Sequence, residues 1–520
     1  VTGEAVVLDS GDFARAARAS MAVPGVFAPI MERGRVLADG GVASYLPVGI
    51  ARAAGASRVI AVDVLRPSAD LGSTDPITLA FRAVRLTLRN TLTANDSPTF
   101  LIAPDISQRF SAAYFPRRPD HLIAAGLSAA QSSLPQATGV AAAQRSAQPP
   151  PTSFSELEIE SFDAALSPLV RSAFRDVPLD RYDPRAIQRA VDRLYATGLF
   201  GGVWPNVEKG AGTAVLIVRA DAAAPTRAAG AVGYDNDRGG RIWASVRNRL
   251  ESGPLEIAAL GSYGTLEAIA SAEARGVLNF APSLAWTLGG GYRETEIRIF
   301  DGDNIDGERD VSRTGGWLGL QWRSIVRERD AAITLVGEHV YDEDGEDGAS
   351  VGAALRFDET GTPARVVGVP VLLEAEARFG EVGYQSAQFA GSIDGGTGDL
   401  LVAAAARIGI ASDDAPPDAL FALGDDHWIP GLRWGDERGR ALVAAGFDVA
   451  YPTMVSGYIR LRVRAGFAGD SFDDADSAER WVAGAGLAGV WHVVVGTIEL
   501  GAAVTDRGDW RLELNLGPVF

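Results

Sequence analysis

The last eleven residues, Trp510 to Phe520, read WRLELNLGPVF and alternate between apolar and polar side chains. Successive side chains of an extended strand point to opposite faces, so these residues divide into an apolar and a polar set. The apolar set is Trp510, Leu512, Leu514, Leu516 and Phe520, and the polar set is Arg511, Glu513 and Asn515. Such alternation predicts a β-strand with one apolar face and one hydrated face.

The same alternation recurs from about Ala231 onward, between Gly/Asp/Asn turns. Examples are Leu318, Leu320 and Trp322 against Gln321 and Arg323; Leu373, Ala375, Ala377 and Phe379 against Glu374, Glu376 and Arg378; Phe447, Val449 and Tyr451 against Asp448; and Ile459, Leu461, Val463, Ala465 and Phe467 against Arg460, Arg462 and Arg464. A soluble sandwich would bury these charges at several kcal/mol each. About 290 residues at roughly 18 per strand and turn therefore predict a 16-stranded transmembrane β-barrel over residues 225–520, surrounded by outer-membrane lipid.

Composition restricts the other possibilities. A chain of 520 residues exceeds one core, so two to four domains are expected. Cysteine is absent and the four histidines are scattered, which predicts neither disulfides nor a metal site, and we expect no cofactor. The net charge of −18 argues against a nucleic-acid partner. No apolar run is long enough for a transmembrane helix. A signal peptide is missing and Val1 opens within a strand-like stretch, so we expect the chain to be incomplete at its amino terminus.

An aspartate followed by two glycines is the strongest chemical signal in residues 1–135. Gly34 to Ala38 predicts a strand ending at Asp39-Gly40-Gly41, a helix spans roughly residues 47–54, and Arg58 to Val64 predicts a buried parallel strand. Together they predict a βαβ unit, in which ligands bind at the carboxyl ends of strands, where Asp39 falls. Gly40 and Gly41 permit a tight turn and close approach of a substrate. An ordinary N-cap is the alternative role for Asp39.

The segment from Ala14 to Pro29 (ARAARASMAVPGVFAP), followed by DGGVASYLPV, resembles the patatin-like phospholipase family. The resemblance continues through Thr99 to Ile106 and the helical stretch from Asp120 to Ser133, and it implies an α/β patatin-like fragment over residues 1–135. It also implies that Asp39 is the general base of a Ser–Asp dyad, which takes the proton of a serine attacking an acyl ester.

The serine of this dyad is not evident. In the family it lies in a G-x-S-x-G elbow upstream of the aspartate, and no such motif precedes Asp39. The match at Gly348 to Gly352 leads into a predicted strand rather than a helix, so we interpret it as chance. We therefore expect this chain alone to be inactive, with the nucleophile and the oxyanion loop upstream of Val1.

A Pro/Ala-rich stretch, residues 136–153, predicts an extended linker. Residues 154–221 then predict a strand at 156–161, helices at 162–174 and 183–197, and a hairpin from Gly202–Lys209 to Thr213–Ala220. This β-α-α-β-β order resembles a POTRA domain, a small α+β domain. The resemblance implies docking beside an outer-membrane barrel and pairing of strand edges with client chains; a spacer without binding function is the alternative.

Three acidic stretches within the barrel predict long loops: Asp301 to Asp310, Tyr341 to Asp347, and Asp470 to Glu479. Solvated loops are favoured over a calcium site because none has EF-hand spacing. Gly431 to Gly435 (GLRWG) resembles the signature loop of BamA-like transporters, which implies that Arg433 reaches into the lumen and packs on the wall. An ordinary extracellular turn is the alternative.

The complete order resembles the type V-d autotransporters, patatin-like surface lipases of Gram-negative bacteria. It implies hydrolysis of membrane phospholipid or other acyl esters at the cell surface, by a passenger that is anchored in the outer membrane or released and that forms a homodimer. Two alternatives are an outer-membrane transport or assembly protein with an inactive patatin remnant, and a periplasm-facing esterase anchored by the barrel.

Overall fold

The computed structural model contains two compact units, residues 1–149 with 453–457, and residues 150–452 with 458–520. The structure describes residues 3–8, 12–23, 27, 29–32, 34–64, 97–104, 120–133, 153–161, 163–209, 214–251, 253–301, 304–325, 329–343, 345, 347–359, 371–397, 400–424, 428–452, 457–477, 480–493 and 496–517. The predicted linker, apart from its last residue, and the aromatic end at Phe520 lie outside these ranges. Each unit is described by itself below.

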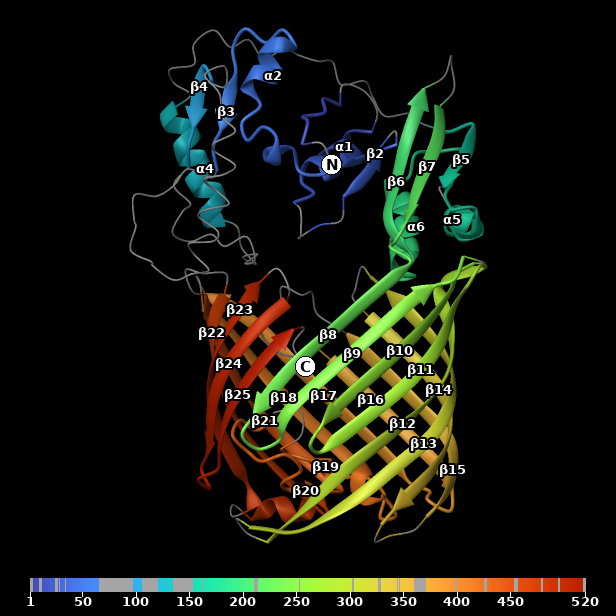
Figure 1. The fold of residues 1–520 in the computed structure, drawn as a ribbon, viewed down its shortest axis with the longest axis vertical. Helices are drawn as coiled ribbons and strands as arrows, with labels where there is room; N and C mark the ends of the chain where they lie inside the picture. Colours follow the sequence, from blue (N-terminus) through green and yellow to red (C-terminus); the bar gives the residue numbers. More distant parts are fainter. Residues whose placement is uncertain are drawn as a thin grey trace. The chain divides into compact units, whose positions relative to one another are not determined.

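The first unit consists of short elements (Figure 1). They are α1 (Phe13–Ser20), β1 (Ile30–Glu32), β2 (Arg35–Leu37), the 3-10 helix η1 (Gly40–Val42), α2 (Val48–Ala53), β3 (Ile60–Val62), β4 (Phe100–Ile102) and α4 (Asp120–Ser133). Asp12 caps α1 by accepting hydrogen bonds from the backbone N–H groups of Ala14 and Arg15. The nearly buried Arg15 then pairs with Glu32 at 2.8 Å, which joins α1 to β1.

The predicted βαβ unit is wrong in its strand pairing. β2 pairs with β1 in an antiparallel hairpin, and β3 pairs in parallel with β4 rather than with β2. The turn between β1 and β2 contains Gly34 at a φ of 75°, a conformation that glycine adopts without strain. This short turn lets β2 pair locally, a possibility that the apolar pattern alone does not reveal.

The second unit begins with a small α+β module. Its elements are β5 (Glu156–Ser161), η4 (Ala164–Leu166), α5 (Ser167–Phe174), α6 (Pro184–Ala196), β6 (Phe200–Lys209) and β7 (Ala214–Ala222). The sheet order is β5-β7-β6, with β5 parallel and β6 antiparallel to β7. Asp183 caps α6 and Pro184 begins it, because a proline at the first helical position lacks only an N–H that would be unbonded. The predicted element order is observed.

The rest of the second unit is a closed barrel of sixteen strands (Figure 1). They are β8 (Thr226–Asp235), β9 (Gly239–Arg249), β10 (Leu255–Gly264), β11 (Glu267–Leu278), β12 (Ala281–Asp301), β13 (Asn304–Ser324), β14 (Arg329–Asp342), β15 (Gly348–Glu359), β16 (Val371–Gly380), β17 (Gln385–Thr397), β18 (Leu400–Ala411), β21 (Ala441–Pro452), β22 (Gly457–Gly469), β23 (Val482–Val493), β24 (Gly496–Thr505) and β25 (Trp510–Gly517). Neighbours in sequence are neighbours in the wall, and β25 pairs with β8 to close it. The predicted 16-stranded barrel is confirmed.

Side chains alternate across the wall as the sequence predicts. Leu461 and Leu514 are 43% and 47% exposed on the outer face, whereas Arg464 is 6% exposed and Asp448 is fully buried inside. Apolar side chains therefore cover the outside, and charged side chains meet one another within. Among the described residues no helix is long and apolar enough to cross a membrane.

The predicted acidic loop from Asp301 to Asp310 is wrong over most of its length, whereas the stretch from Asp470 to Glu479 lies in the connection between β22 and β23, as predicted. Most of the stretch from Asp301 to Asp310 is strand, because β12 and β13 continue as a hairpin to Asp301 and Asn304. Arg298 lies opposite Glu308 in the register of this hairpin, and its guanidinium pairs with Asp237 at 2.9 Å. In the stretch from Asp470 to Glu479, residues Phe472–Asp476 form the 3-10 helix η7, capped by Ser471. Gly348 to Gly352 lies in strand β15, consistent with a chance match to the serine motif.

The α+β module contacts one mouth of the barrel through charged groups and a shared core. Arg249 of β9 pairs with Asp163 at 2.7 Å, and Arg275 of β11 donates a hydrogen bond of 3.0 Å to the carbonyl of Thr197. Val277 and Ala285 of the barrel are buried in the module's own hydrophobic core. The module and the barrel thus share one continuous packed region.

Replacing Asp448 by alanine tests how strongly the lumen depends on its ion pairs. Asp448 accepts hydrogen bonds from Arg464 at 2.9 and 3.2 Å and from Arg462 at 3.4 Å. Its loss removes the carboxylate that these two inward arginines share, so the unfolding free energy in detergent micelles should fall by about 3–5 kcal/mol. Asp413→Ala is the control, since this side chain is 91% exposed and its pair with Arg440 should contribute less than about 1 kcal/mol. Equal losses in the two variants would contradict the assignment of Asp448.

Candidate functional site

Asp39 begins the 3-10 helix η1 as its N-cap. Its Oδ1 accepts a hydrogen bond of 2.7 Å from the N–H of Gly41, and its own N–H donates to the carbonyl of Ala22 at 2.9 Å. Among the described residues, Oδ2 of Asp39 has no hydrogen-bond partner, and the side chain is half-buried. The capping role that the sequence offers as the alternative is therefore present. Capping uses only Oδ1 of Asp39, so Oδ2 could still accept a proton.

The turn glycines leave little space beside Asp39. A Cβ at Gly41 would stand 2.9 Å from Oδ1 of Asp39, and a Cβ at Gly40 would stand 3.4 Å from the hydroxyl of Ser20. Behind this turn, the hydroxyl of Tyr45 donates a hydrogen bond to Asp63, which is 2% exposed at the carboxyl end of β3. Asp39 is thus bonded to Ala22, just after α1, and Tyr45, which follows the turn, is bonded to the end of the parallel strand β3.

The segment between β18 and β21, residues 412–440, folds into the barrel, and we call it the lumen loop. It includes η5 (Pro417–Ala419), β19 (Phe421–Ala422) and β20 (Arg438–Gly439), and Figure 1 shows β19 and β20 within the barrel outline. Leu423, Ile429 and Leu432 are fully buried against inward residues of β21, β22 and β23. On the far side, Asp418 binds Arg313 of β13 with bonds of 2.5 and 2.8 Å. The loop therefore crosses the lumen from one wall to the other.

Aromatic residues of the lumen loop contact inward arginines. The ring of Trp428 lies 4.5 Å from the guanidinium carbon of Arg464 and 5.9 Å from that of Arg407. Trp434 lies 4.5 Å from the guanidinium of Arg238. Cation–π contacts of this kind contribute roughly 0.5–2 kcal/mol each. They hold the loop to strands that lie on different sides of the barrel.

Arg433, the residue singled out by the GLRWG motif, packs on the barrel wall. Its guanidinium carbon lies 4.5 Å from the ring of Phe300 in β12, and Nε lies 3.2 Å from Asp509 in the turn between β24 and β25. Its Nη2 bonds Asp436 at 3.3 Å. Burial raises the pKa of the Asp436 carboxyl, and the charge of Arg433 opposes that shift. The structure therefore places Arg433 among wall residues, and not in an exposed turn.

The β8–β9 turn, residues 235–238, is a part of this arrangement that sequence reasoning misses. Asp237 accepts a hydrogen bond of 2.6 Å from the N–H of Trp434 and one of 2.9 Å from Arg298. Asn236 binds the backbone of β25 through the N–H of Leu512 at 2.7 Å. The run Asp-Asn-Asp-Arg signals a turn, but only the closed barrel shows that this turn meets both the lumen loop and the last strand.

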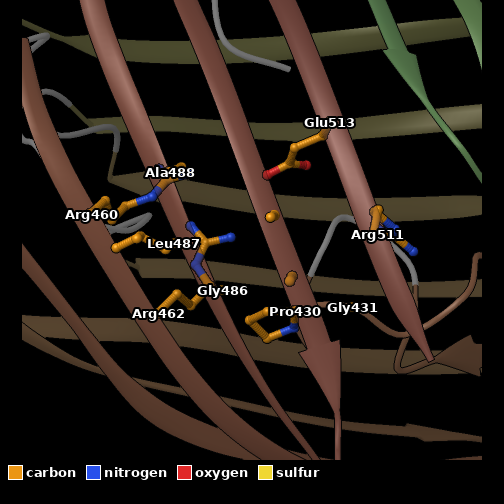
Figure 2. A pocket seen from close by; sticks show the side chains of 11 residues that line it. Pro430, Gly431, Arg460, Arg462, Gly486, Leu487, Ala488, Arg511 and Glu513 are labelled. Atoms are coloured by element: carbon orange, nitrogen blue, oxygen red, sulfur yellow. The ribbon is translucent and has the colours of Figure 1, made fainter. Parts of the chain in front are cut away.

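Figure 2 shows a pocket where the lumen loop meets the wall at Pro430 and Gly431. Arg460 and Arg462 come from β22, and Arg511 and Glu513 come from β25. Its volume is about 30 Å³, which holds about one water molecule. This site is a packing contact and is too small for a substrate. Within the ranges the structure describes, no cluster of three or more His, Cys, Asp or Glu residues could hold a metal ion.

Comparisons with known proteins match a short segment in the first unit to one family and most of the chain to the fold of outer-membrane barrel proteins. The family model for patatin-like phospholipase matches residues 4–52, which include Asp39. BamA from Haemophilus ducreyi, lacking POTRA domains 1–3, has a similar fold with a TM-score of 0.54 and 13% identity; the alignment covers 72% of this chain and 85% of that one. CdiB from Acinetobacter baumannii has a TM-score of 0.51 and 12% identity, over 70% of this chain and 74% of that one. At these identities the likeness concerns the fold.

Gly431→Ala tests whether the lumen loop is fixed by close contact. Gly431 has a φ of 87°, and a Cβ there would stand 2.7 Å from the backbone of Val504 in β24. Gly508→Ala is the matched control, because φ is 97° and nothing lies within 4 Å of its Cβ position. The control should lose about 1–3 kcal/mol of unfolding free energy from strain, and Gly431→Ala about 1–3 kcal/mol more from overpacking.

Trypsin provides the second measurement for this pair. Cleavage after Arg433 or Arg438 should be faster in Gly431→Ala than in Gly508→Ala, because a displaced loop exposes these arginines. Equal cleavage rates would show that the loop does not depend on its approach to β24.

Proposed function

We propose that the protein is a patatin-like acyl hydrolase of the Gram-negative outer membrane, whose lipase part is delivered to the cell surface by its own POTRA domain and barrel. The substrate class is membrane phospholipid or another acyl ester. One observation carries the proposal: a single chain joins a patatin-like segment, residues 4–52, to a closed barrel of sixteen strands. Neither part alone points to a surface lipase, because folds of each kind serve several functions.

Exposed apolar residues in the first unit support an α/β hydrolase part. β3 and β4 form a parallel pair of three residues each, and Ile60, Val62 and Leu101 are 40–52% exposed. Parallel sheets are normally covered on both faces and contain more strands. These short strands therefore fit as part of a larger α/β sheet, which is what a complete patatin-like domain would supply.

In the proposed reaction Asp39 takes the proton of a serine nucleophile as that serine attacks the ester carbonyl. Among the described residues its Oδ2 accepts no hydrogen bond, and Gly40 and Gly41 carry no side chain that could cover the carboxylate. The serine belongs to a G-x-S-x-G elbow that the proposal places upstream of Val1. Asp39 then gives that proton to the leaving alcohol oxygen as its bond to the acyl carbon breaks. In a second step Asp39 takes a proton from water as the water attacks the acyl-serine, and it returns the proton to the serine oxygen as the fatty acid leaves.

The outer surface of the barrel supports its placement in lipid. Leucine, isoleucine, valine and aromatic residues remain exposed along nearly every strand, and such a continuous apolar band is stable only against hydrocarbon. The α+β module supports a POTRA assignment. The alignment with BamA spans 72% of this chain, about 374 residues, whereas Thr226 to Gly517 is 292 residues, so it extends beyond the barrel.

Asp39→Asn tests the acid–base role. In the intact protein, hydrolysis of a chromogenic acyl ester should fall by about 10²–10⁴ in kcat, because the amide cannot accept the serine proton. Asp12→Asn is the control, since both residues cap helices and asparagine caps about as well as aspartate. Full activity in Asp39→Asn would refute the dyad. Unchanged low activity in the wild type and in both variants would favour the transport protein with an inactive remnant.

Protease shaving of whole cells tests surface delivery. With an epitope tag in residues 134–152, added protease should remove the tag from intact cells, while the barrel stays protected by the membrane. The α+β module should become sensitive only after the outer membrane is permeabilised. If the tag resists protease until permeabilisation, the hydrolase faces the periplasm and the barrel serves only as its anchor.

A further inference from the structure

A second and much larger cavity opens beside the lumen loop. It lies between the β12–β13 hairpin, residues 433–438 of the loop, and the β24–β25 turn, and its volume is about 490 Å³. Small-molecule sites commonly measure 300–1,000 Å³. We call it the Arg438 cavity. It is formed by barrel residues and the lumen loop alone, so its function is independent of the proposed hydrolysis.

Positively charged side chains dominate the lining of this cavity. Five arginines line it, against three carboxylates: Arg298, Arg309, Arg433, Arg438 and Arg507, with Asp436, Glu437 and Asp509. Four of these arginines have carboxylate partners, such as Asp342 for Arg309 and Glu437 for Arg507. The exception is Arg438.

Arg438 bonds only backbone carbonyls in the described part of the chain. Its Nε donates to the carbonyl of Gly435 at 3.0 Å and its Nη1 to that of Pro417 at 3.3 Å. These two bonds fix the orientation of the guanidinium without neutralising its charge. A half-buried arginine held in place in this way is preorganised for an anion.

Arg298 provides an independent sign of a missing acceptor. Its side chain is 11% exposed, and Nη1 bonds Asp237 at 2.9 Å. Its buried Nε has no hydrogen-bond acceptor among the described residues, because the carboxylate of Glu296 lies 3.7 Å away, beyond hydrogen-bond distance. Buried donors are almost always bonded, so a donor of this kind beside a cavity indicates an acceptor from outside the chain.

We propose that the Arg438 cavity binds the phosphate of a phosphorylated sugar. Guanidinium groups bind phosphate oxygens with paired, charge-assisted hydrogen bonds, and Arg438 and Arg298 supply such donors. The cavity is larger than a phosphate group alone requires, and the carboxylates of Glu437 and Asp509 accept hydrogen bonds from sugar hydroxyls. The sugar phosphate is either a diffusible molecule or the headgroup of a glycolipid in the surrounding membrane.

Calorimetric titration of the full chain in detergent micelles tests the diffusible form. The probe is glucose 1-phosphate, with glucose as the uncharged comparison. Arg438→Gln and Arg298→Gln should each weaken binding of glucose 1-phosphate about tenfold or more, the effect of losing one charge-assisted hydrogen bond. Arg440→Gln is the matched control: it lies in the same loop, pairs with the exposed Asp413 and does not line the cavity.

Native mass spectrometry tests the glycolipid form, with micelles containing a glycolipid whose glucosamine disaccharide carries phosphate. One glycolipid should remain bound per barrel, and Arg438→Gln and Arg298→Gln should lower the occupied fraction while Arg440→Gln does not. Circular dichroism melting confirms that each variant is folded.

Binding of either probe with this dependence on the variants supports the site and identifies its source. The proposal is overturned if the wild type binds neither probe, if both cavity variants bind as tightly as the wild type, or if glucose binds as well as glucose 1-phosphate.

Discussion

Arginines that point into the barrel must find partners there, and this requirement organises the interior. A sixteen-stranded barrel encloses more space than the side chains of its wall can fill. Carboxylates of the wall neutralise some of these arginines: Asp448 forms ion pairs with Arg462 and Arg464, and Glu499 forms one with Arg460. The lumen loop provides further partners: Asp418 forms an ion pair with Arg313, and the ring of Trp428 makes a cation–π contact with Arg407. Filling the lumen and neutralising its charges are thus achieved by the same segment.

Because one loop satisfies groups on many strands, strands that are distant in the wall become energetically coupled. Asp418 reaches β13, Arg433 reaches β12, and Gly431 lies against β24. A displacement at any of these points would leave buried charges unpaired elsewhere, at a cost of several kcal/mol. The loop therefore has few alternative positions, which agrees with the complete burial of Leu423 and Leu432.

The period-two pattern predicts the barrel, because closure requires each strand to separate apolar from charged residues, and the length of residues 225–520 at roughly 18 residues per strand and turn predicts its sixteen strands. The sequence alone is not sufficient to predict the structure at three places. The acidic composition of residues 301–310 predicts a loop, whereas strands β12 and β13 continue as a hairpin to Asp301 and Asn304, where Arg309 pairs with Asp342 of β14. The β1–β2 hairpin replaced the predicted βαβ pairing because Gly34 allows a local turn. Arg433 could be singled out by resemblance, but its contacts with Phe300 and Asp509 depend on tertiary closure.

The closing pair of strands shows how closure and lumen filling depend on each other. Among the residues that the structure describes, β25 and β8 share four residue pairs, whereas β12 and β13 share eighteen. Side chains extend this short pairing: Asn236 bonds the N–H of Leu512 at 2.7 Å, and Arg241 bonds Asn515 at 3.2 Å. The residue next to Asn236, Asp237, bonds the N–H of Trp434 in the lumen loop. The β8–β9 turn thus binds both the last strand and the lumen loop. A shift of the lumen loop would therefore weaken the contact that closes the barrel between β8 and β25.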